Sequence, residues 1–363
     1  MKILHVITSL GTGGAEKLLV DMLPRLRDMG CDVELLVFDG TPTPFMQRLQ
    51  DSGIVVHRLH AHGGVYSPMN VALLMPYMRR YDVIHTHNTA CQLYVPMAHL
   101  LAGGKAKLVT TEHSTYNRRR DKWYFKPIDR WMYDRYSAIA SVSDKSTRLL
   151  CDYIGTDRVM TVENGIDIGA YADAVPADRQ IMVPDYKEHD VVVTMVAGFR
   201  EAKDQDSLIR AISVLPDNYK LCLVGDGMRR SEIEALVASL GMQGRVRLMG
   251  VRSDVAQILK ASDVNVLLSH WEGLSLSSVE GMASGRPFVA SDVDGLREVV
   301  GGNGVLFSDG DYRQLADVLQ HLMTDKAEYA RVSKACVDAA KRYDIAVTAR
   351  RYYEIYNTLC QRN

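Results

Sequence analysis

Short apolar segments alternate with amphipathic ones along nearly the whole chain. In the first half, apolar runs bounded by turn residues predict strands at 2–8, 32–38, 54–59, 82–87, 107–113 and 138–143. In the second half, the same pattern predicts strands at 191–199, 219–227, 245–250, 264–269 and 287–292. The stretches between them, such as 15–30, have the periodicity of amphipathic helices. This alternation is typical of βα units around a parallel sheet.

The pattern indicates two domains. A chain of 363 residues is long for one hydrophobic core, and the periodicity is lost at 168–190, which contains two prolines. We interpret 168–190 as a linker between Rossmann-like, doubly wound domains at 1–170 and 171–345. Because ligands bind at the carboxyl ends of parallel strands, we expect these ends to face each other across a cleft.

Composition narrows the class of protein. An apolar content of 47%, a charged content of 24% and a net charge of −1 are ordinary for a globular protein and do not favour nucleic acid as a partner. The six cysteines lie far apart, as in a cytosolic protein with reduced thiols. No signal peptide and no apolar run long enough to span a membrane is evident, so we expect a cytoplasmic protein.

The sequence "GTGGAE" at 11–16 follows the first predicted strand and opens a helix. Glycines in this position allow backbone amides to approach a phosphate at the helix N-terminus. A dinucleotide-binding fingerprint would require glycine where this chain has Glu16, which weakens an NAD-binding interpretation. A tight turn without a ligand is the alternative.

The corresponding turn of the second domain, "AGFREAKDQDSLIRA" at 197–211, contains two basic residues. Arg200 and Lys203 would stand beside a helix N-terminus, where cations and amides together favour a phosphate. An ordinary solvated surface is the alternative interpretation.

The sequence "HWEGLSLSSVEGMASG" at 270–285 places two glutamates around a turn of small residues. It follows a predicted buried strand and opens a helix, so its free amides form a second candidate phosphate site. Carboxylates accept hydrogen bonds from ribose and sugar hydroxyls, which suits Glu272 and Glu280. A capping box formed by Ser277 and Glu280 would need no ligand, but it would not account for Glu272.

Histidines follow several predicted strands. His57, His60 and His62 are most simply structural. The sequence His-Thr-His at 85–87 places two imidazoles on one face of a strand, but no third metal ligand accompanies them at a recognisable spacing. His113 ends its strand, at the edge where active sites of α/β proteins collect.

Residues 117–135 carry seven basic residues against three acidic ones, interleaved with aromatic residues. A basic and aromatic helix suits an anionic membrane surface or a pyrophosphate-linked lipid. A solvated face with buried aromatic residues is equally compatible with the pattern.

Taken together and in this order, the motifs resemble a family 4 glycosyltransferase of the GT-B fold, over nearly the whole chain. The resemblance rests on "GGAE" (13–16), "TEH" (111–113), "NGID" (164–167), "FREAKDQDSLIRA" (199–211) and the stretch at 272–300, which is similar to the family's signature of two glutamates separated by seven residues. It implies that a C-terminal helix at 346–363 crosses back to the first domain.

The resemblance also implies roles for individual residues. Glu280 would bind the ribose, Glu272 the donor sugar, and Lys203 the diphosphate. The implied catalytic residues are His113, Lys203 and Glu272. The implied donor-binding residues are Gly14, Arg200, Lys203, Arg252, Gly273, Leu274, Ser275, Leu276, Ser277 and Glu280. The implied acceptor-binding residues are Gly13, Glu16 and His87. Many family members have arginine where this chain has Gly198, and we expect Arg200 to supply that charge.

The implied activity is transfer of a hexosyl or N-acetylhexosaminyl group from a nucleotide-diphosphate sugar, such as a UDP-sugar, to a glycan or lipid-linked glycan in surface polysaccharide or glycolipid biosynthesis. The family retains the anomeric configuration and usually needs no metal or other cofactor. The enzyme would then be cytoplasmic and peripheral on the inner face of the membrane, which it would contact through 117–135. A nucleotide-sugar 2-epimerase and a non-catalytic sugar-nucleotide-binding protein of the same fold are the alternatives.

Overall fold

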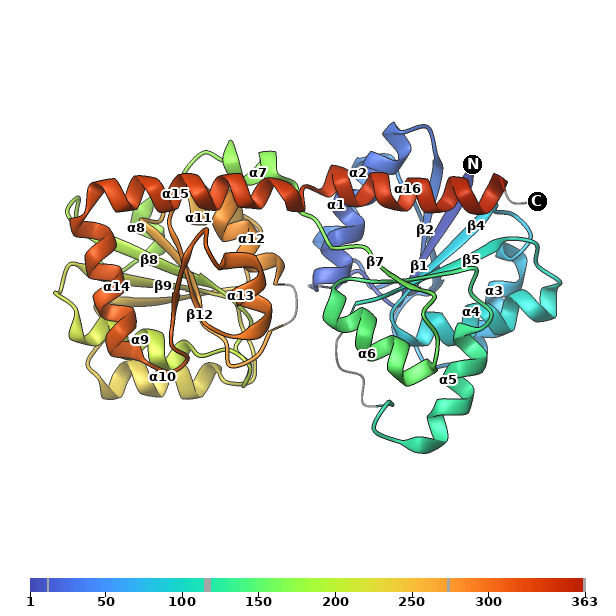
Figure 1. Cartoon of the computed structure of the whole chain (residues 1–363), viewed down its shortest axis with the longest axis horizontal. Helices are drawn as coiled ribbons and strands as arrows, with labels where there is room; N and C mark the ends of the chain where they lie inside the picture. Colours follow the sequence, from blue (N-terminus) through green and yellow to red (C-terminus); the bar gives the residue numbers. More distant parts are fainter. Residues whose placement is uncertain (12, 114–118, 273–274, 362–363) are drawn as a thin grey trace. The chain divides into compact units, whose positions relative to one another are not determined.

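The computed structural model describes residues 1–11, 13–113, 119–272 and 275–361. The chain divides into two compact units, which we call the first domain (Met1–Gly165 with Ile345–Asn363) and the second domain (Ile166–Asp344). Each domain is built around its own sheet, with helices on both faces (Figure 1).

The first domain contains a seven-stranded sheet in the order β3-β2-β1-β4-β5-β6-β7, and all neighbouring strands are parallel. Its strands are β1 (Lys2–Ile7), β2 (Asp32–Asp39), β3 (Val55–His60), β4 (Val83–His87), β5 (Lys107–Glu112), β6 (Ala138–Ser141) and β7 (Val159–Thr161). The strand order reverses direction between β1 and β4, and this switch point is where doubly wound sheets bind ligands.

Helices cover both faces of the first sheet. One face packs against α1 (Gly14–Asp28), α2 (Pro44–Asp51) and the C-terminal helix α16 (Ile345–Gln361). The opposite face packs against α3 (Asn70–Leu74), α4 (Thr89–Ala102), α5 (Lys126–Tyr133) and α6 (Asp144–Ile154). Short 3₁₀ turns lie at Met75–Tyr77 and Trp123–Phe125. Because Tyr352 and Tyr356 of α16 are completely buried, the end of the chain is part of this domain's core.

The second domain repeats the arrangement with a six-stranded parallel sheet in the order β10-β9-β8-β11-β12-β13. Its strands are β8 (Val191–Val196), β9 (Tyr219–Val224), β10 (Val246–Gly250), β11 (Val264–Leu267), β12 (Phe288–Ser291) and β13 (Val305–Phe307). The switch point of this sheet lies between β8 and β11.

The second domain's helices are α7 (Ile168–Ala172), α8 (Arg179–Met182), α9 (Gln205–Val214), α10 (Arg230–Ser239), α11 (Val255–Ala261), α12 (Leu276–Ala283), α13 (Asp294–Val300), α14 (Tyr312–Thr324) and α15 (Lys326–Ala340), with a 3₁₀ turn at Lys341–Tyr343. Most of them contribute to one large core, and α8 and α11 pack in a smaller cluster with Val192, Cys222 and Val224.

The predicted fold class, two doubly wound α/β domains, is confirmed. Each predicted strand overlaps a strand of the structure, because buried parallel strands are continuous apolar runs. The edge strands β7 and β13 were missed, since three residues are too short to show a period.

The interpretation of 168–190 as a linker is wrong. This segment contains α7 and α8 and packs on the second domain. Ile168 and Tyr171 belong to the large core, and Met182 and Val183 are completely buried in the smaller one. The missing periodicity therefore reflects short helices and not an exposed connection.

The close packing of the loops at the strand ends of the second domain requires glycine at position 225. This residue has a φ of +137°, and a Cβ atom there would overlap the carbonyl oxygen of Ala197. We expect Gly225→Ala to lower the melting temperature by well over the ~2–4 °C that about 1 kcal/mol of strain produces in a domain of this size.

The matched control is Gly241→Ala. Gly241 has a φ of +67° but no atom within 4 Å of the added Cβ, so it tests the backbone conformation without the overlap. Equal melting temperatures for the two variants would contradict the close approach of the loops.

Candidate active site

Most predicted donor-binding residues lie at the carboxyl ends of the strands of the second sheet. Arg200 and Lys203 follow β8, Arg252 follows β10, and Glu272 follows β11. Backbone hydrogen bonds connect these loops, from Phe199 N to Asp226 O (3.0 Å), Gly225 N to Gly250 O (2.9 Å) and His270 N to Ala202 O (3.0 Å). The loops therefore form one continuous surface at this edge of the sheet.

Lys203 and Glu272 meet in an ion pair. The Lys203 Nζ atom donates to Glu272 Oε1 at 2.5 Å and to Ser269 Oγ at 3.2 Å. Their side chains are 15% and 17% exposed, so the pair is largely shielded from solvent. The adjacency of β8 and β11 brings them together, since Lys203 and Ser269 form a β-bridge just beyond the two strands. Ser269, which holds the same cation, belongs to no motif that the sequence shows.

The N-terminus of α12 excludes the capping-box alternative. The N-cap residue is Ser275, whose side chain makes no capping hydrogen bond, and Ser277 is already the second residue of the helix. The first helical hydrogen bonds run from the N–H groups of Ser278 and Val279 to Ser275 O. Within the described chain, this leaves the N–H groups of Leu276 and Ser277 available to a ligand.

Glu280 lies in the fifth position of α12 and is only 5% exposed. It is therefore too far along the helix to act as the third residue of a capping box. The predicted donor-binding residues Gly273 and Leu274 lie outside the described residues.

Two arginines frame the same edge in different ways. Arg200 is exposed, and its side chain makes no hydrogen bond or ion pair within the described chain. A Cβ atom at Gly198 would lie 3.4 Å from Arg200 Nε, so this guanidinium group passes beside Gly198. Arg252 instead forms two hydrogen bonds with Asp254, at 2.8 and 2.6 Å, which raise the pKa of Arg252 and lower that of Asp254.

In the first domain, Gly13 is the N-cap of α1 and Gly14 is its first residue. A Cβ atom at Gly13 would overlap the carboxylate of Glu16, so this carboxylate lies against the helix N-terminus. Burial raises the pKa of Glu16. A side chain at position 13 would therefore displace the carboxylate of Glu16, and an acidic group already stands near the amides that would attract a phosphate.

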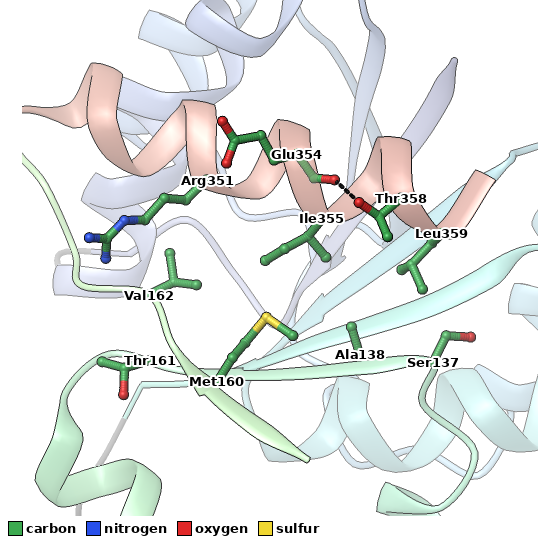
Figure 2. Close-up of a pocket in the computed structure, with 10 residues that line it drawn as sticks. All are labelled: Ser137, Ala138, Met160, Thr161, Val162, Arg351, Glu354, Ile355, Thr358 and Leu359. Carbon is green, nitrogen blue, oxygen red and sulfur yellow. Dashed lines mark hydrogen bonds between the residues drawn. The ribbon is translucent and has the colours of Figure 1, made fainter. Parts of the chain in front are cut away.

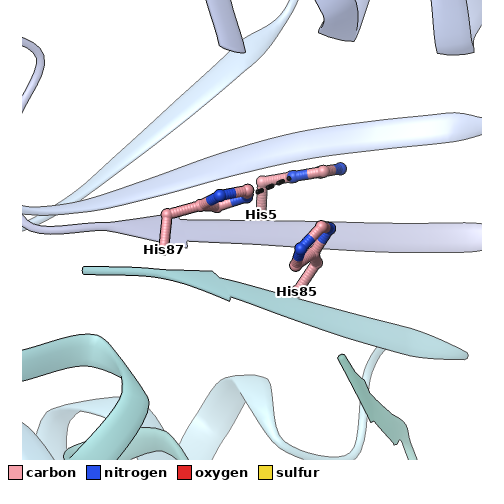
Figure 3. A group of neighbouring side chains, drawn as sticks. All are labelled: His5, His85 and His87. Atoms are coloured by element: carbon pink, nitrogen blue, oxygen red, sulfur yellow. Dashed lines mark hydrogen bonds between the residues drawn. The ribbon is translucent and has the colours of Figure 1, made fainter. Parts of the chain in front are cut away.

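His113 follows β5 and is joined to a cluster of buried histidines. His87 Nδ1 lies 2.9 Å from His113 Nε2, and His5 Nδ1 lies 3.0 Å from His87 Nε2. Figure 3 shows the bond between His5 and His87, with the ring of His85 beside them. His87 is completely buried and both of its ring nitrogens are hydrogen-bonded, so it exposes no atom to an acceptor.

His5 is the residue that the sequence pattern missed. It pairs in register with His85, across β1 and β4. His5, His85 and His87 therefore share one face of the sheet, and each offers a ligand atom within 4.8 Å of the others. Asp204, His270 and Asp309 form a second such group in the second domain. In the sequence, His5 is noticeable only as a histidine within the apolar run of β1. Its proximity to the histidines of β4 cannot be inferred without the strand order.

The basic and aromatic segment divides into two parts. Arg119 and Arg120 turn inward, where Arg119 pairs with Asp129 and Arg120 donates to Glu112 at 2.9 Å. Trp123 is 85% exposed, and Tyr124 and Ile128 are also exposed, among exposed basic residues at 122, 126, 130 and 135. The described residues of this segment thus present apolar and cationic groups together on the surface.

A groove of about 440 Å³ lies elsewhere in the first domain, between α16 and the edge of the sheet at β6 and β7 (Figure 2). Met160, Val162, Ile355 and Leu359 give it a largely apolar lining, and Arg351 and Glu354 lie on the α16 side. It contains none of the predicted site residues.

Among the described residues, no helix has the length and apolar character needed to cross a membrane.

Two family profiles match the chain. Residues 12–169 match the profile described as Glycosyltransferase Family 4, and residues 190–325 match the one described as Glycosyl transferases group 1. The chain is 26% identical over 329 residues to the lipopolysaccharide core biosynthesis glycosyltransferase LpsE of Rhizobium meliloti (strain 1021), with 89% of each chain covered.

Two further matches are informative. The chain is 25% identical over 268 residues to the UDP-Gal:alpha-D-GlcNAc-diphosphoundecaprenol alpha-1,3-galactosyltransferase of Escherichia coli, covering 68% of this chain and 67% of that protein. The crystal structure of Anabaena HepE in complex with UDP-glucose has a TM-score of 0.83 at 23% identity, with 99% of this chain and 100% of that chain covered. This structural likeness shows the fold.

Proposed function

The chain belongs to the family 4 glycosyltransferases, and we propose that it transfers a sugar from a UDP-sugar to a hydroxyl group of a glycan or lipid-linked glycan, with retention of the anomeric configuration. The observation that carries this proposal is the meeting of Lys203 and Glu272 at the carboxyl edge of the second sheet, where α12 begins and Glu280 follows.

A nucleotide sugar presents three chemical groups, and the second domain offers a partner for each. The diphosphate suits Lys203 together with the amides of Leu276 and Ser277, which have no partner among the residues that the structure describes. The ribose hydroxyls suit the carboxylate of Glu280, and the sugar hydroxyls suit that of Glu272. Relatives support the choice of nucleotide, since HepE was crystallised with UDP-glucose and the galactosyltransferase is named for UDP-Gal.

Arg200 supplies the second cation for the diphosphate. Its guanidinium group is exposed, is without a side-chain partner in the described chain, and passes beside Gly198. Arginine there would stabilise the negative charge that builds up as the sugar–phosphate bond breaks. Arg252, which is held by Asp254, is assigned to the edge of the base-binding region.

We assign the neutralisation of the leaving diphosphate to Lys203, Arg200 and the amides of α12, without a metal or other cofactor. Fixed cations and amides stabilise charge that develops in the transition state, and this is the largest contribution in many enzymes. The leaving phosphate then helps to deprotonate the acceptor hydroxyl on the same face of the sugar. Front-face substitution of this kind retains the configuration without a covalent glycosyl–enzyme intermediate.

The first domain is assigned to the acceptor, with His113 beside the reacting sugar and with Gly13 and Glu16 at the start of α1. A lipid-linked acceptor would explain the surface around Trp123, because an exposed indole among basic residues suits an anionic membrane. We therefore place the enzyme at the inner face of the membrane, in surface polysaccharide or glycolipid synthesis. The names of LpsE and the diphosphoundecaprenol-dependent enzyme support this setting.

Ligand-induced stabilisation tests the ribose assignment. A ligand at 100 times its Kd stabilises a protein by about 2.7 kcal/mol, so UDP should raise the melting temperature of the wild type by several degrees. Glu280→Ala should abolish this shift, because the ribose loses its partner. Ser277→Ala is the control: it removes a neighbouring hydroxyl but keeps the backbone amide, so the shift should remain. A full shift with Glu280→Ala would contradict the assignment.

The ion pair allows the phosphate and sugar contacts to be tested separately. Lys203→Ala should weaken UDP binding by about tenfold or more, because a cation is lost from the diphosphate. Glu272→Gln should bind UDP at least as tightly as the wild type, because Lys203 is then released from its carboxylate. The same variant should lose affinity for whichever of UDP-glucose, UDP-galactose and UDP-N-acetylglucosamine binds the wild type best. Calorimetric titration measures both effects, and equal losses of UDP and UDP-sugar affinity in Glu272→Gln would refute these roles.

Vesicle sedimentation tests the membrane assignment. Trp123→Ser should reduce binding to phosphatidylglycerol vesicles about tenfold, since burial of one large apolar side chain contributes roughly 1.5–3 kcal/mol. Tyr66→Ser removes another exposed aromatic residue of the same domain and should leave binding unchanged. Binding that does not respond to Trp123→Ser, or no binding by the wild type, would overturn the assignment.

A further inference from the structure

Three histidines form a chain of hydrogen bonds that ends at His113. His5 and His87, from β1 and β4, are joined at 3.0 Å, and His87 and His113 are joined at 2.9 Å. The chain thus runs from the buried face beneath α16 to the carboxyl end of β5, where His113 is only partly covered. His87 is the central member, and each of its ring nitrogens makes one bond.

Both ends of the chain have an unused nitrogen atom. His5 Nε2 and His113 Nδ1 are buried atoms with no hydrogen-bond partner in the described part of the protein. Buried polar groups normally find partners, so each of these atoms needs an explanation.

The three rings are neutral at physiological pH. Burial lowers the pKa of His5 to about 3 and that of His113 to about 4, and it holds the pKa of His87 well below its ordinary value. Positive charge on the neighbouring residues His85, His113 and His5 would repel a proton on His87, and this lowers the pKa of His87 further. A neutral imidazole carries one N–H group, so the chain contains three protons in all.

These protons have only two possible arrangements. Each of the two hydrogen bonds takes one proton, and the directions of the bonds are coupled because His87 cannot donate from both of its nitrogens. The third proton then lies at one end of the chain, on His5 Nε2 or on His113 Nδ1.

The environment decides between the two ends. His5 is completely buried, and an N–H group there would have no acceptor. Buried N–H groups without a partner are rarer in proteins than unused acceptors, so the lone pair belongs on His5 Nε2. His113 Nδ1 is a buried atom as well, but its residue is partly exposed and ends its strand at the edge where ligands bind, so an N–H group there gains a partner once a substrate reaches it, whereas one on His5 Nε2 does not.

We infer that His5 and His87 are positioning residues that hold His113 in the tautomer with its proton on Nδ1, so that it presents a hydrogen-bond donor and not a base to a substrate oxygen. The tautomer follows from the hydrogen-bond chain together with the burial of its two ends. The part that concerns substrate rests on the proposed function. A donor at this position stabilises an oxygen that is already bound or becomes negative, and it leaves deprotonation of the acceptor to the leaving phosphate.

His85 provides a matched comparison within the same cluster. It is also completely buried, and its ring centroid lies 4.2 Å from that of His87. Its two ring nitrogens, however, bond to Tyr356 OH at 2.6 Å and to Thr111 Oγ1 at 2.8 Å. His85 therefore forms no hydrogen bond to the other three histidines. Thr111 Oγ1 bonds in turn to Tyr352 OH at 2.8 Å. The polar groups of α16, β4 and β5 beside the three hydrogen-bonded histidines are therefore the hydroxyls of Tyr356, Tyr352 and Thr111 and the imidazole of His85.

A divalent cation is the competing occupant of this cluster. His5, His85 and His87 offer ligand atoms within 4.8 Å of one another, and neutral imidazoles bind zinc well. A cation would occupy the lone pairs that the hydrogen-bond chain needs, so a metal site and the chain exclude each other.

Nitrogen NMR of the full-length wild type, labelled with ¹⁵N in histidine, tests the tautomer directly. We expect the His113 signals, identified by their loss in His113→Asn, to show a protonated Nδ1 that does not titrate down to about pH 5. A proton on Nε2, titration near the ordinary pKa of histidine, or one zinc ion per purified chain by elemental analysis would overturn the inference. This measurement is independent of any enzymatic activity.

Transfer assays then test the consequence. His87→Leu should lower kcat by about tenfold, as expected for the loss of one orienting hydrogen bond, whereas His85→Leu should change it by less than about threefold. Both variants remove a completely buried imidazole of β4, and melting curves show whether both fold. His113→Asn, whose amide N–H replaces that on Nδ1, should retain about ten times more activity than His113→Leu.

The outcomes separate the two proposals. If the wild type transfers no sugar while His113 has its proton on Nδ1, the proposed function fails and the hydrogen-bond chain stands. If the wild type is active but His87→Leu and His85→Leu behave alike, or His113→Asn is as inactive as His113→Leu, the role of the chain in the reaction is wrong.

Discussion

Parallel pairing of every strand is the constraint on which both domains depend. Because all carboxyl ends of a parallel sheet lie at one edge, residues that are distant in the sequence reach the same surface. Lys203 and Glu272 are 69 positions apart and still form an ion pair, since β8 and β11 are neighbours. The same constraint places His113 at the end of β5, beside the end of β4 that carries His87. The candidate site of each domain therefore follows from the order of its strands.

The fold class was predictable because buried parallel strands are continuous apolar runs, and these runs survive in the sequence as a simple pattern. The elements that were not predicted are short and are formed through tertiary contacts. Strands β7 and β13 have three residues each, and α8 has four, so none is long enough to show a period. Met182 is completely buried, but it packs in one cluster with Ile258, which comes much later in the chain.

The chemical types of the candidate residues were readable from the sequence, whereas their partners were not. The spacing of Glu272 and Glu280 predicted a ligand whose hydroxyl groups bind to carboxylates. The pairing of Glu272 with Lys203, however, depends on strand order. Choosing Ser275 over Ser277 as the start of α12 requires the backbone conformation of the loop, and several serines there make the choice ambiguous in the sequence. His5 likewise joins His85 only through the register of β1 against β4.

The ion pair has a consequence for selectivity under the proposed function. While Lys203 is paired with Glu272, a diphosphate alone has to compete with a carboxylate for the cation and leaves Glu272 without a partner in a largely shielded position. Loss of one partner from such a pair is costly, because the remaining charge is only partly solvated. A nucleotide sugar avoids that cost, since its phosphates take Lys203 while its sugar hydroxyls take Glu272. The pair therefore couples the two halves of the donor, so that an intact nucleotide sugar gains more from this site than the sum of its separate parts.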